Sequence, residues 1–266
     1  MASTISTIAA NKPDYGVDAP QVLRNLFLFG VPCLLLGIFG PRHVQIGPVD
    51  FLPRPMFFVT GVLLVLEGFL YLFYVKFGKF RHRDLMLSLH RWRGDEQVLD
   101  VGCGRGLLLA GAAKRLSGTG HATGIDIWSN EDMGGNSEAA TRRNLQLEEV
   151  GERCTLLSVP AQEMTFPDAV FDVVVSNLCL HNVYDRKARR RALRQIERVL
   201  KPGGAAILSD YKLTGEYADE LRSAGFSVEK RWGNPLYTFP PLRIVVGRKP
   251  PVNSSAMELP NVPSRP

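Results

Sequence analysis

The sequence predicts an α/β fold in which two hydrophobic helices precede a seven-stranded, mostly parallel sheet. Between residues 97 and 248, short apolar runs typical of strands alternate with longer segments of helical character, which is the order that a parallel sheet with helical crossovers requires. The first strand runs directly into a glycine-rich turn at residues 102–106. Two long apolar runs stand before this region. A length of 266 residues is enough for one ordinary α/β domain with such an appendage.

The two apolar runs have the length and composition of membrane segments. Leu26–Gly40 carries no charged residue, and Met56–Val75 carries only Glu67. The second run has about the 20 residues that a membrane-spanning helix needs, whereas the first is shorter and contains Pro32. Neither run shows the polar face that a helix on the surface of a soluble domain would present.

We therefore predict a two-helix membrane hairpin over residues 22–77, preceded by a polar N-terminus at 1–21 and turned at 41–55. The alternative is a pair of buried or interfacial helices packed on the domain that follows. Lysine and arginine are more frequent after the second run than in the connecting loop, so the positive-inside rule places the later domain on the cytoplasmic side of the membrane. These residues are Lys76, Lys79, Arg81 and Arg83 after the run, against Arg42 and Arg54 in the loop.

A nucleotide-type binding site is indicated by the segment Gln97–Gly106, which reads QVLDVGCGRG. Its three alternate glycines permit positive φ values and let a ligand approach the backbone closely. A helix is expected immediately afterwards, over residues 105–116. A second apolar run ends at Asp126, whose carboxylate is well placed to accept hydrogen bonds from a ribose. Strand, glycine turn, helix, strand and acid together predict a site at the carboxyl end of the parallel sheet.

The spacing of the glycines and the position of Asp100 favour one class of nucleotide. The pattern is G-x-G-x-G, and Leu107 occupies the position of the third glycine of a dinucleotide fingerprint. Asp100 is a poor neighbour for a pyrophosphate but a good one for an ammonium group. At these residues the chain resembles the class I S-adenosylmethionine-dependent methyltransferases, whose first motif commonly reads V-L-D-x-G-C-G-x-G. The resemblance covers about residues 85–248 and implies a Rossmann-like fold with S-adenosylmethionine as cofactor.

The resemblance also implies which residues hold the cofactor. Asp100 would face its amino group, and Trp128 either stacks on the adenine or is an ordinary, partly exposed aromatic residue. Where relatives usually have an acid near the adenine, this chain has Pro160. The adenine contacts are then left to the backbone N–H of Ala161 and the side-chain amide of Gln162. The expected set is Asp100, Gly102, Cys103, Gly104, Gly106, Asp126, Ile127, Trp128, Ala161, Gln162 and Asn177.

The remaining elements follow in the expected order, and the domain is predicted to span residues 78–249. The last two strands have no helix between them, which implies an antiparallel edge, as in the resembled family. Residues 250–266 are rich in proline and serine and are predicted to be a disordered tail. Helices are predicted around 83–92 and at 137–148, 186–200 and 216–224, a turn at 201–204, and strands at 154–159, 170–176, 205–209, 226–231 and 242–246.

The residues that act on the methyl acceptor are expected after the fourth and fifth strands. These are Asn177 and His181 after the fourth strand, and Asp210 and Tyr211 after the fifth. His181 is the best candidate for a general base, because imidazole exchanges protons near neutral pH. The alternative is that His181 only hydrogen-bonds a loop. Tyr237, in the segment before the last strand, is expected to cap the acceptor pocket.

Charge is concentrated in one predicted helix. Residues 186–201 contain eight lysines and arginines and one glutamate, a net charge of +7 that exceeds the +6 of the whole chain. These side chains form either a solvated outer helix face or a contact with anionic lipid headgroups. The four cysteines form no CxxC pair, which disfavours a disulfide framework or a structural zinc site and suits a reducing compartment. No metal is expected.

Three functional classes follow from these observations. The favoured class is a membrane-anchored S-adenosylmethionine-dependent methyltransferase of a small apolar or lipid-like acceptor, such as an isoprenoid or quinone-like molecule. Tethering supports this class, because it raises the effective concentration of an acceptor dissolved in the same membrane. The alternatives are an anchored protein or RNA methyltransferase, or a non-catalytic module that retains the cofactor fold. The Asn-Pro-Pro-Tyr signature of amino-base nucleic-acid methyltransferases is absent, so no nucleic-acid partner is expected.

Overall fold

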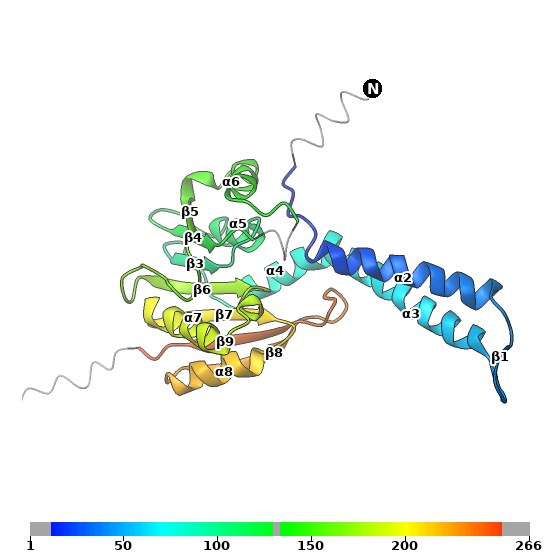
Figure 1. Ribbon diagram of the computed structural model, residues 1–266. Helices are drawn as coiled ribbons and strands as arrows, with labels where there is room; N and C mark the ends of the chain where they lie inside the picture. Colours follow the sequence, from blue (N-terminus) through cyan, green and yellow to red (C-terminus); the bar gives the residue numbers. More distant parts are fainter. Residues whose placement is uncertain (1–11, 130–133, 252–266) are drawn as a thin grey trace, which may run out of the picture.

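The structure is a computed structural model that describes residues 12–129 and 134–251 (Figure 1). A seven-stranded sheet is covered by helices on both faces, and a long two-helix hairpin projects from one side of it (Figure 1). Most of the predicted tail at 250–266 and residues 1–11 of the predicted polar N-terminus lie outside the described residues.

The sheet has the predicted mostly parallel architecture. Its strands are β3 (Gln97–Val101), β4 (His121–Asp126), β5 (Cys154–Ser158), β6 (Phe171–Asn177), β7 (Leu200–Asp210), β8 (Ser227–Trp232) and β9 (Arg243–Arg248). Their order is β5-β4-β3-β6-β7-β9-β8, and the pairings from β5 to β7 are all parallel. Strand β9 pairs antiparallel with both β7 and β8, so the predicted antiparallel edge is confirmed. The carboxyl ends of the central strands therefore meet at one edge of the sheet.

Two apolar clusters hold the helices against the sheet. The helices of the domain are α4 (Lys79–Ser88), α5 (Leu107–Ala113), α6 (Glu138–Leu147), α7 (Arg186–Val199) and α8 (Thr214–Ser223). Val98 of β3 packs in the cluster with Leu109 of α5, whereas the next residue, Leu99, packs in the cluster with Ile196 of α7. All four side chains are fully buried. Burial on both faces is typical of parallel sheets and explains the nearly continuous apolar runs of the sequence.

Two elements differ from the sequence prediction. The helix after the glycine turn is shorter than the predicted 105–116, because the chain turns after Ala113 and the N–H of Ser117 donates to the carbonyl of Gly94 at 2.7 Å. Residues 201–204 were predicted to be a turn, but they belong to β7. The N–H of Gly203 donates to Lys249 O at 3.1 Å, which extends the pairing of this segment beyond β9.

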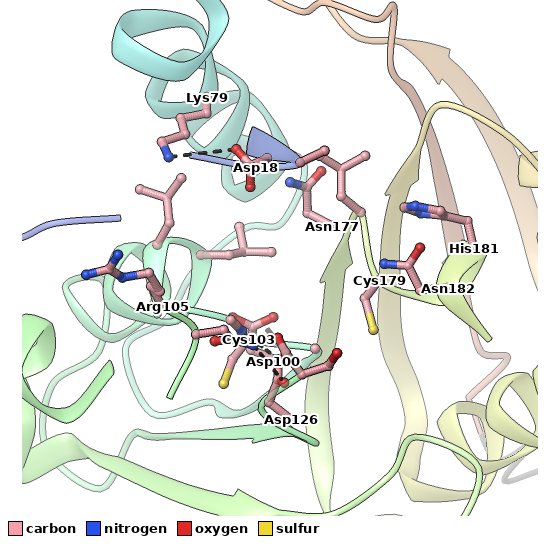
Figure 2. Close-up of a pocket in the computed structure, with 18 of the residues that line it drawn as sticks. Asp18, Lys79, Asp100, Cys103, Arg105, Asp126, Asn177, Cys179, His181 and Asn182 are labelled. Carbon is pink, nitrogen blue, oxygen red and sulfur yellow. Dashed lines mark hydrogen bonds and ion pairs between the residues drawn. The ribbon is translucent and has the colours of Figure 1, made fainter. Parts of the chain in front are cut away.

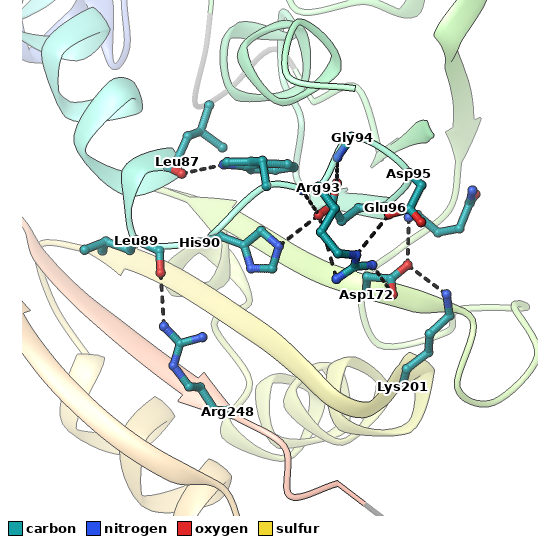
Figure 3. Close-up of polar contacts among 12 residues, drawn as sticks. Leu87, Leu89, His90, Arg93, Gly94, Asp95, Glu96, Asp172, Lys201 and Arg248 are labelled. Carbon is teal, nitrogen blue, oxygen red and sulfur yellow. Dashed lines mark hydrogen bonds and ion pairs between the residues drawn. The ribbon is translucent and has the colours of Figure 1, made fainter. Parts of the chain in front are cut away.

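The connection between α4 and β3 is fixed by a buried carboxylate (Figure 3). Glu96 is fully buried and accepts hydrogen bonds from the backbone N–H groups of Arg93 at 2.6 Å and Gly94 at 2.9 Å. Burial alone would raise the pKa of Glu96, but these two N–H groups, its own N–H and the imidazole of His90 together hold the pKa below its usual value. At the start of β6, Asp172 accepts from the N–H of Gln97 at 2.9 Å, which ties β3 to its neighbour.

The basic helix α7 is largely paired with acids rather than freely solvated. Arg189 is only 5% exposed and donates to Glu216 at 2.9 Å. Three further basic side chains of this region also meet carboxylates of the same domain. These pairs are Arg190 with Glu220, Arg198 with Asp168, and Lys201 with Asp172. The charge concentration therefore has a structural use within the domain.

The hairpin consists of α2 (Pro20–Phe39) and α3 (Pro53–Phe73). The predicted turn between them contains a short antiparallel pair, β1 (Val44–Ile46) and β2 (Val49–Phe51), at the far tip of the hairpin (Figure 1). Helix α3 continues through a π-helical turn at Tyr74–Gly78 into α4 without a break. The hairpin is thus joined rigidly to the helix that packs on the sheet.

The two hairpin helices pack on each other and leave their apolar side chains outside. By length and composition, both helices are long and apolar enough to cross a membrane. Only 6% of the most apolar stretch of the first helix and 17% of that of the second is buried. A Cβ at Gly61 would collide with the backbone of Leu34, so the helices approach closely where glycines lie. This exposure disagrees with burial of the two helices on the domain, whereas a membrane-spanning or an interfacial position would both agree with it. The exposed side chains include Leu28, Phe29, Leu35, Val59, Leu63, Leu66 and Phe69.

Candidate functional site

A cavity of about 580 Å³ lies at the carboxyl ends of β3, β4 and β6 (Figure 2). Its floor is the glycine turn that follows β3, and its far wall is formed by the base of the hairpin. Most of the predicted cofactor residues line it, so the structure brings them together around one cavity. These are Asp100, Gly102, Cys103, Gly104, Asp126, Ile127, Ala161, Gln162 and Asn177.

The glycine turn has the backbone geometry that its sequence predicts. Gly102, Gly104 and Gly106 have φ values of 72°, 51° and 83°, which residues with a Cβ rarely adopt. A Cβ at Gly102 would also collide with Sγ of Cys179, so only glycine lets the Cys179 side chain pack this closely against the turn. Gly106 begins α5 and does not line the cavity, so its role is to shape the turn.

Asp100 is the most unusual charged group in the cavity. It is 1% exposed, and its Oδ2 has no hydrogen-bond partner among the described residues. Burial, together with the nearby charge of Asp126, raises the pKa of Asp100 to about 8. A cationic ligand group would satisfy the free oxygen and favour the ionised carboxylate.

Asp126 is held in place by the turn itself. Its Oδ2 accepts from the N–H of Gly104 at 2.8 Å, and its Oδ1 accepts from the N–H of Trp128 at 2.7 Å. Trp128 has a left-handed backbone, and its indole N–H donates to Ser158 Oγ at 2.7 Å. The ring is therefore not part of the cavity lining, and the preceding residue, Ile127, takes that place.

The predicted acceptor-side residues gather around one buried carboxylate. Nδ1 of His181 lies 2.9 Å from Oδ1 of Asp210. The imidazole ring of His181 packs edge-on against the ring of Tyr211. His181, Tyr211 and Asn177 line the cavity, whereas Asp210 is 1% exposed and lies behind His181. Asp210 was predicted to act on the acceptor, but the structure makes it the residue that orients His181. Oδ1 of Asn177 is buried without a hydrogen-bond partner among the described residues.

Comparison with known proteins identifies the family. Residues 99–208 match a family model described as a methyltransferase domain. This segment contains the glycine turn, Asp126 and the β6 loop, which are the parts that form the cavity floor. Residues 99–208 form a class I S-adenosylmethionine-dependent methyltransferase domain.

Relatives of the methyltransferase domain include two groups of quinone-modifying proteins. The chain is 31% identical over 139 residues to the chloroplastic 2-phytyl-1,4-beta-naphthoquinone methyltransferase of Arabidopsis thaliana, over 51% of each chain. It is 34% identical over 119 residues to the ubiquinone/menaquinone biosynthesis C-methyltransferase UbiE of Vibrio campbellii, over 45% of this chain and 42% of that one. The chain thus spans about half the length of the curated relatives it matches.

Solved structures confirm the fold of the methyltransferase domain. An O-methyltransferase family protein from Burkholderia thailandensis superposes with a TM-score of 0.56 at 16% identity, covering 87% of this chain and 71% of that one. The cyclase SpnF superposes with a TM-score of 0.54 at 19% identity, covering 89% and 99%. At these identities the likeness concerns the fold alone.

The residues present fit S-adenosylmethionine, the cofactor of this family. The unpartnered oxygen of Asp100 fits its amino group, and the cavity beside Gly102 and Gly104 leaves room for its sulfonium and methionine portion. Asp126 lies at the cavity edge, as a ribose contact requires. Ala161 and Gln162 line the cavity beside Ile127, so they remain the predicted contacts to the adenine.

Sequence reasoning missed one wall of the cavity. The methyltransferase domain is covered by residues 14–19, which run across the cavity, and by the inner ends of the hairpin helices. Lys79 holds this segment by donating to the carbonyls of Tyr15 at 2.9 Å and Gly16 at 2.6 Å, and it lies 3.7 Å from Asp18. The OH of Tyr15 donates to Glu148 at 2.6 Å. No local pattern marks these residues, because their partners lie far away in the sequence.

The segment before β9 also differs from expectation. Tyr237 was predicted to cap the acceptor pocket, but it does not line the cavity. Its carbonyl packs against Gly78 instead, and Phe239 and Pro240 form the cavity wall. The ring of Phe239 meets Tyr71 of α3 edge-on at 6.5 Å, which joins this segment to the hairpin.

Proposed function

We propose that this protein is a membrane-anchored S-adenosylmethionine-dependent methyltransferase that acts on a small apolar, lipid-like acceptor with a nucleophilic head group. The observation that carries the proposal is the continuity of one cavity. It begins at the glycine turn with Asp100 and ends at an apolar wall that the hairpin provides through Tyr71 and Tyr74. The proposed cofactor site and the proposed apolar acceptor site therefore share one cavity.

Methyl transfer asks little of the protein beyond alignment and exclusion of water. When bound, S-adenosylmethionine supplies an already activated methyl group. Asp100 and Asp126 hold the two ends of its methionine and ribose portion, and the segment at 14–19 closes the site against water. His181 accepts the proton that the acceptor gives up, and Asp210 stabilises the resulting imidazolium.

The relatives support an apolar acceptor. By their names, one of these relatives acts on 2-phytyl-1,4-beta-naphthoquinone and the other is a C-methyltransferase of ubiquinone and menaquinone biosynthesis. The cavity wall of this chain suits such a molecule, because Leu178, Phe239 and Leu242 form an apolar cluster with Tyr71 and Tyr74. An anchored methyltransferase of protein or RNA is the alternative that the assay below distinguishes.

Membrane anchoring is supported by the exposed apolar surface of the hairpin. A 20-residue helix rises about 30 Å, which matches the hydrocarbon core of a bilayer. The charge bias around the hairpin supports a cytoplasmic position of the catalytic domain. A protease site inserted at the hairpin tip, at the exposed Gly47, tests this topology. We expect cleavage only from the face of sealed vesicles opposite the catalytic domain, and cleavage from the same face would contradict it.

The activity is tested with the full chain reconstituted in phospholipid vesicles. Methyl-labelled S-adenosylmethionine is supplied with a demethylated naphthoquinol that carries an isoprenoid chain, and the lipid extract is counted. We expect label in the extracted quinol with the wild-type chain and almost none with His181→Ala. A parallel incubation with protein and RNA fractions of the host is the control. Label in those fractions, and none in the lipid extract, would favour the alternative.

A further inference from the structure

The two ends of the cavity differ in character. At one end lie the glycine turn and the carboxylates of Asp100 and Asp126. At the other end the wall is apolar and belongs to the hairpin base and the β8–β9 loop. We propose that the apolar chain of the acceptor leaves the cavity between the inner ends of α2 and α3 and the loop at 234–241, and passes directly into the bilayer. This inference rests on the proposed function.

The apolar wall is built from aromatic and aliphatic side chains of three separate segments. Tyr71 and Tyr74 of the α3 end meet edge-on at 6.2 Å, and Phe239 packs on Tyr71 from the loop. Leu178, which follows β6, and Leu242, just before β9, complete the lining. A flexible hydrocarbon chain needs such a lining, because burying its methylenes is favourable without any directional contact.

The cavity reaches the outer surface at the base of the hairpin. Val22, in the first turn of α2, lines the cavity and is nevertheless 50% exposed. The exposed ring of Phe77 and the exposed Lys76 lie at the same end of the hairpin, on the turn that follows α3. Exposed aromatic and basic residues at the end of a membrane helix are typical of the headgroup level. The opening therefore lies where an acceptor dissolved in the bilayer would present its chain.

The direction of the chain follows from the polar groups further in. The ion pair between Asp18 and Lys79 lines the same cavity and lies above Asp100 in Figure 2. Oδ2 of Asp18 is buried and has no hydrogen-bond partner among the described residues. A hydrocarbon chain placed there would leave these groups desolvated at a cost, whereas a polar head group would satisfy them. The polar head group of the acceptor therefore lies within the cavity, and its apolar chain extends out of the cavity.

The passage has fixed walls. Gly78 lies in the π-helical turn below α3, and a Cβ there would collide with the carbonyl oxygen of Tyr237. This close approach docks the loop on the hairpin base and sets the spacing between Phe239 and α3. The loop and the hairpin base therefore form one side of the proposed passage together.

The test compares acceptors with and without the chain. Val22→Trp places a large ring at the opening, and Leu35→Trp, on the exposed face of the same helix, is the matched control. Each variant in phospholipid vesicles receives a demethylated naphthoquinol with a long isoprenoid chain or the same ring without a chain. We expect Val22→Trp to lower kcat/KM for the long-chain quinol by about tenfold or more. Its kcat/KM for the chainless ring should equal that of the wild type.

Several outcomes would overturn the inference. If Val22→Trp lowered kcat/KM equally for both quinols, the chain would not pass Val22. If Leu35→Trp lowered kcat/KM for the long-chain quinol as selectively as Val22→Trp does, the effect would not be specific to the opening, and the passage would again be rejected. Cofactor affinity, measured by calorimetry, checks that each variant is folded. If Val22→Trp fails that check, the smaller Val22→Phe replaces it, and an unchanged ratio between the two quinols then rejects the passage. A wild-type chain that methylates neither quinol would instead reject the proposed function itself.

Discussion

Nδ1 of His181 hydrogen-bonds the buried carboxylate of Asp210, at 2.9 Å from Oδ1 and 3.0 Å from Oδ2. The same carboxylate accepts from the OH of Tyr217 at 3.0 Å and from the N–H of Tyr211 at 2.9 Å. The carboxylate of Asp210 can only accept hydrogen bonds, so Nδ1 of His181 must carry the proton that it donates. Nε2 has no hydrogen-bond partner among the described residues and is left as the basic nitrogen.

His181→Ala and Asp210→Asn test this pair. We expect either change to lower kcat by about 100-fold or more, because one removes the base and the other removes the carboxylate that orients it. Cofactor affinity should change little, since neither residue belongs to the predicted cofactor set. Stopped assays with calorimetry in parallel measure both quantities. Full activity in His181→Ala would reduce this histidine to a loop contact.

Asp100 predicts a pH dependence of cofactor binding. In the empty site its pKa is about 8, so the carboxyl group is protonated below that pH, while a bound ammonium group favours the ionised form. Binding below about pH 8 must therefore release a proton, and affinity should rise with pH by up to about tenfold per unit between about pH 6 and pH 8. Calorimetry in buffers of different ionisation enthalpy counts the proton. Asp100→Asn should bind weakly with no such slope.

Asp100 also affects the stability of the empty protein. Its folded pKa lies above the ordinary value of an unfolded aspartate, so the folded state holds a proton that the unfolded chain has lost. This contribution to stability is complete below about pH 4 and disappears as pH rises through about 8. Saturating S-adenosylmethionine should remove this loss of stability at high pH, because its ammonium group pairs with the ionised carboxylate of Asp100.

Gly102→Ala should abolish cofactor binding. The added Cβ would collide with Sγ of Cys179 at a φ of 72°, so the turn that lines the cofactor cavity would have to shift. Gly215→Ala is the control, because no atom lies within 4 Å of its Cβ position and its φ is not positive. Equilibrium binding of S-adenosylmethionine distinguishes the two. Equal affinity in both variants would contradict the placement of the cofactor on the turn.

Glu96 predicts a loss of stability in acid. Its folded pKa lies below the unfolded value, so its contribution is present above about pH 4 and is lost as pH falls through the folded pKa. Glu96→Gln should lower stability by about 1–3 kcal/mol, because it weakens the bonds from the N–H groups of Arg93 and Gly94. Thermal unfolding in detergent micelles measures this. The exposed Glu152→Gln should leave the midpoint unchanged.

The sequence alone predicted the order of strands and helices and the floor of the cofactor site. These features depend on local patterns: apolar runs that form buried strands, and a glycine turn whose φ values only its own residues decide. Asp100 and Asp126 therefore line one cavity, because each lies at the carboxyl end of its strand and parallel strands bring these ends together.

Only the tertiary structure shows that residues 14–19 run across the cavity, which side chains form its apolar wall, and that Asp210 lies behind His181. Tyr15 meets Glu148 across 133 positions of the chain, and His181 meets Asp210 across 29. Trp128 and Ile127 are adjacent, yet only the left-handed backbone at Trp128 determines which of them lines the cavity. Such contacts depend on how distant segments pack, which local periodicity and spacing do not encode. The sequence thus determined the site for the cofactor, and the packing of the hairpin determined the shape of the space beside it.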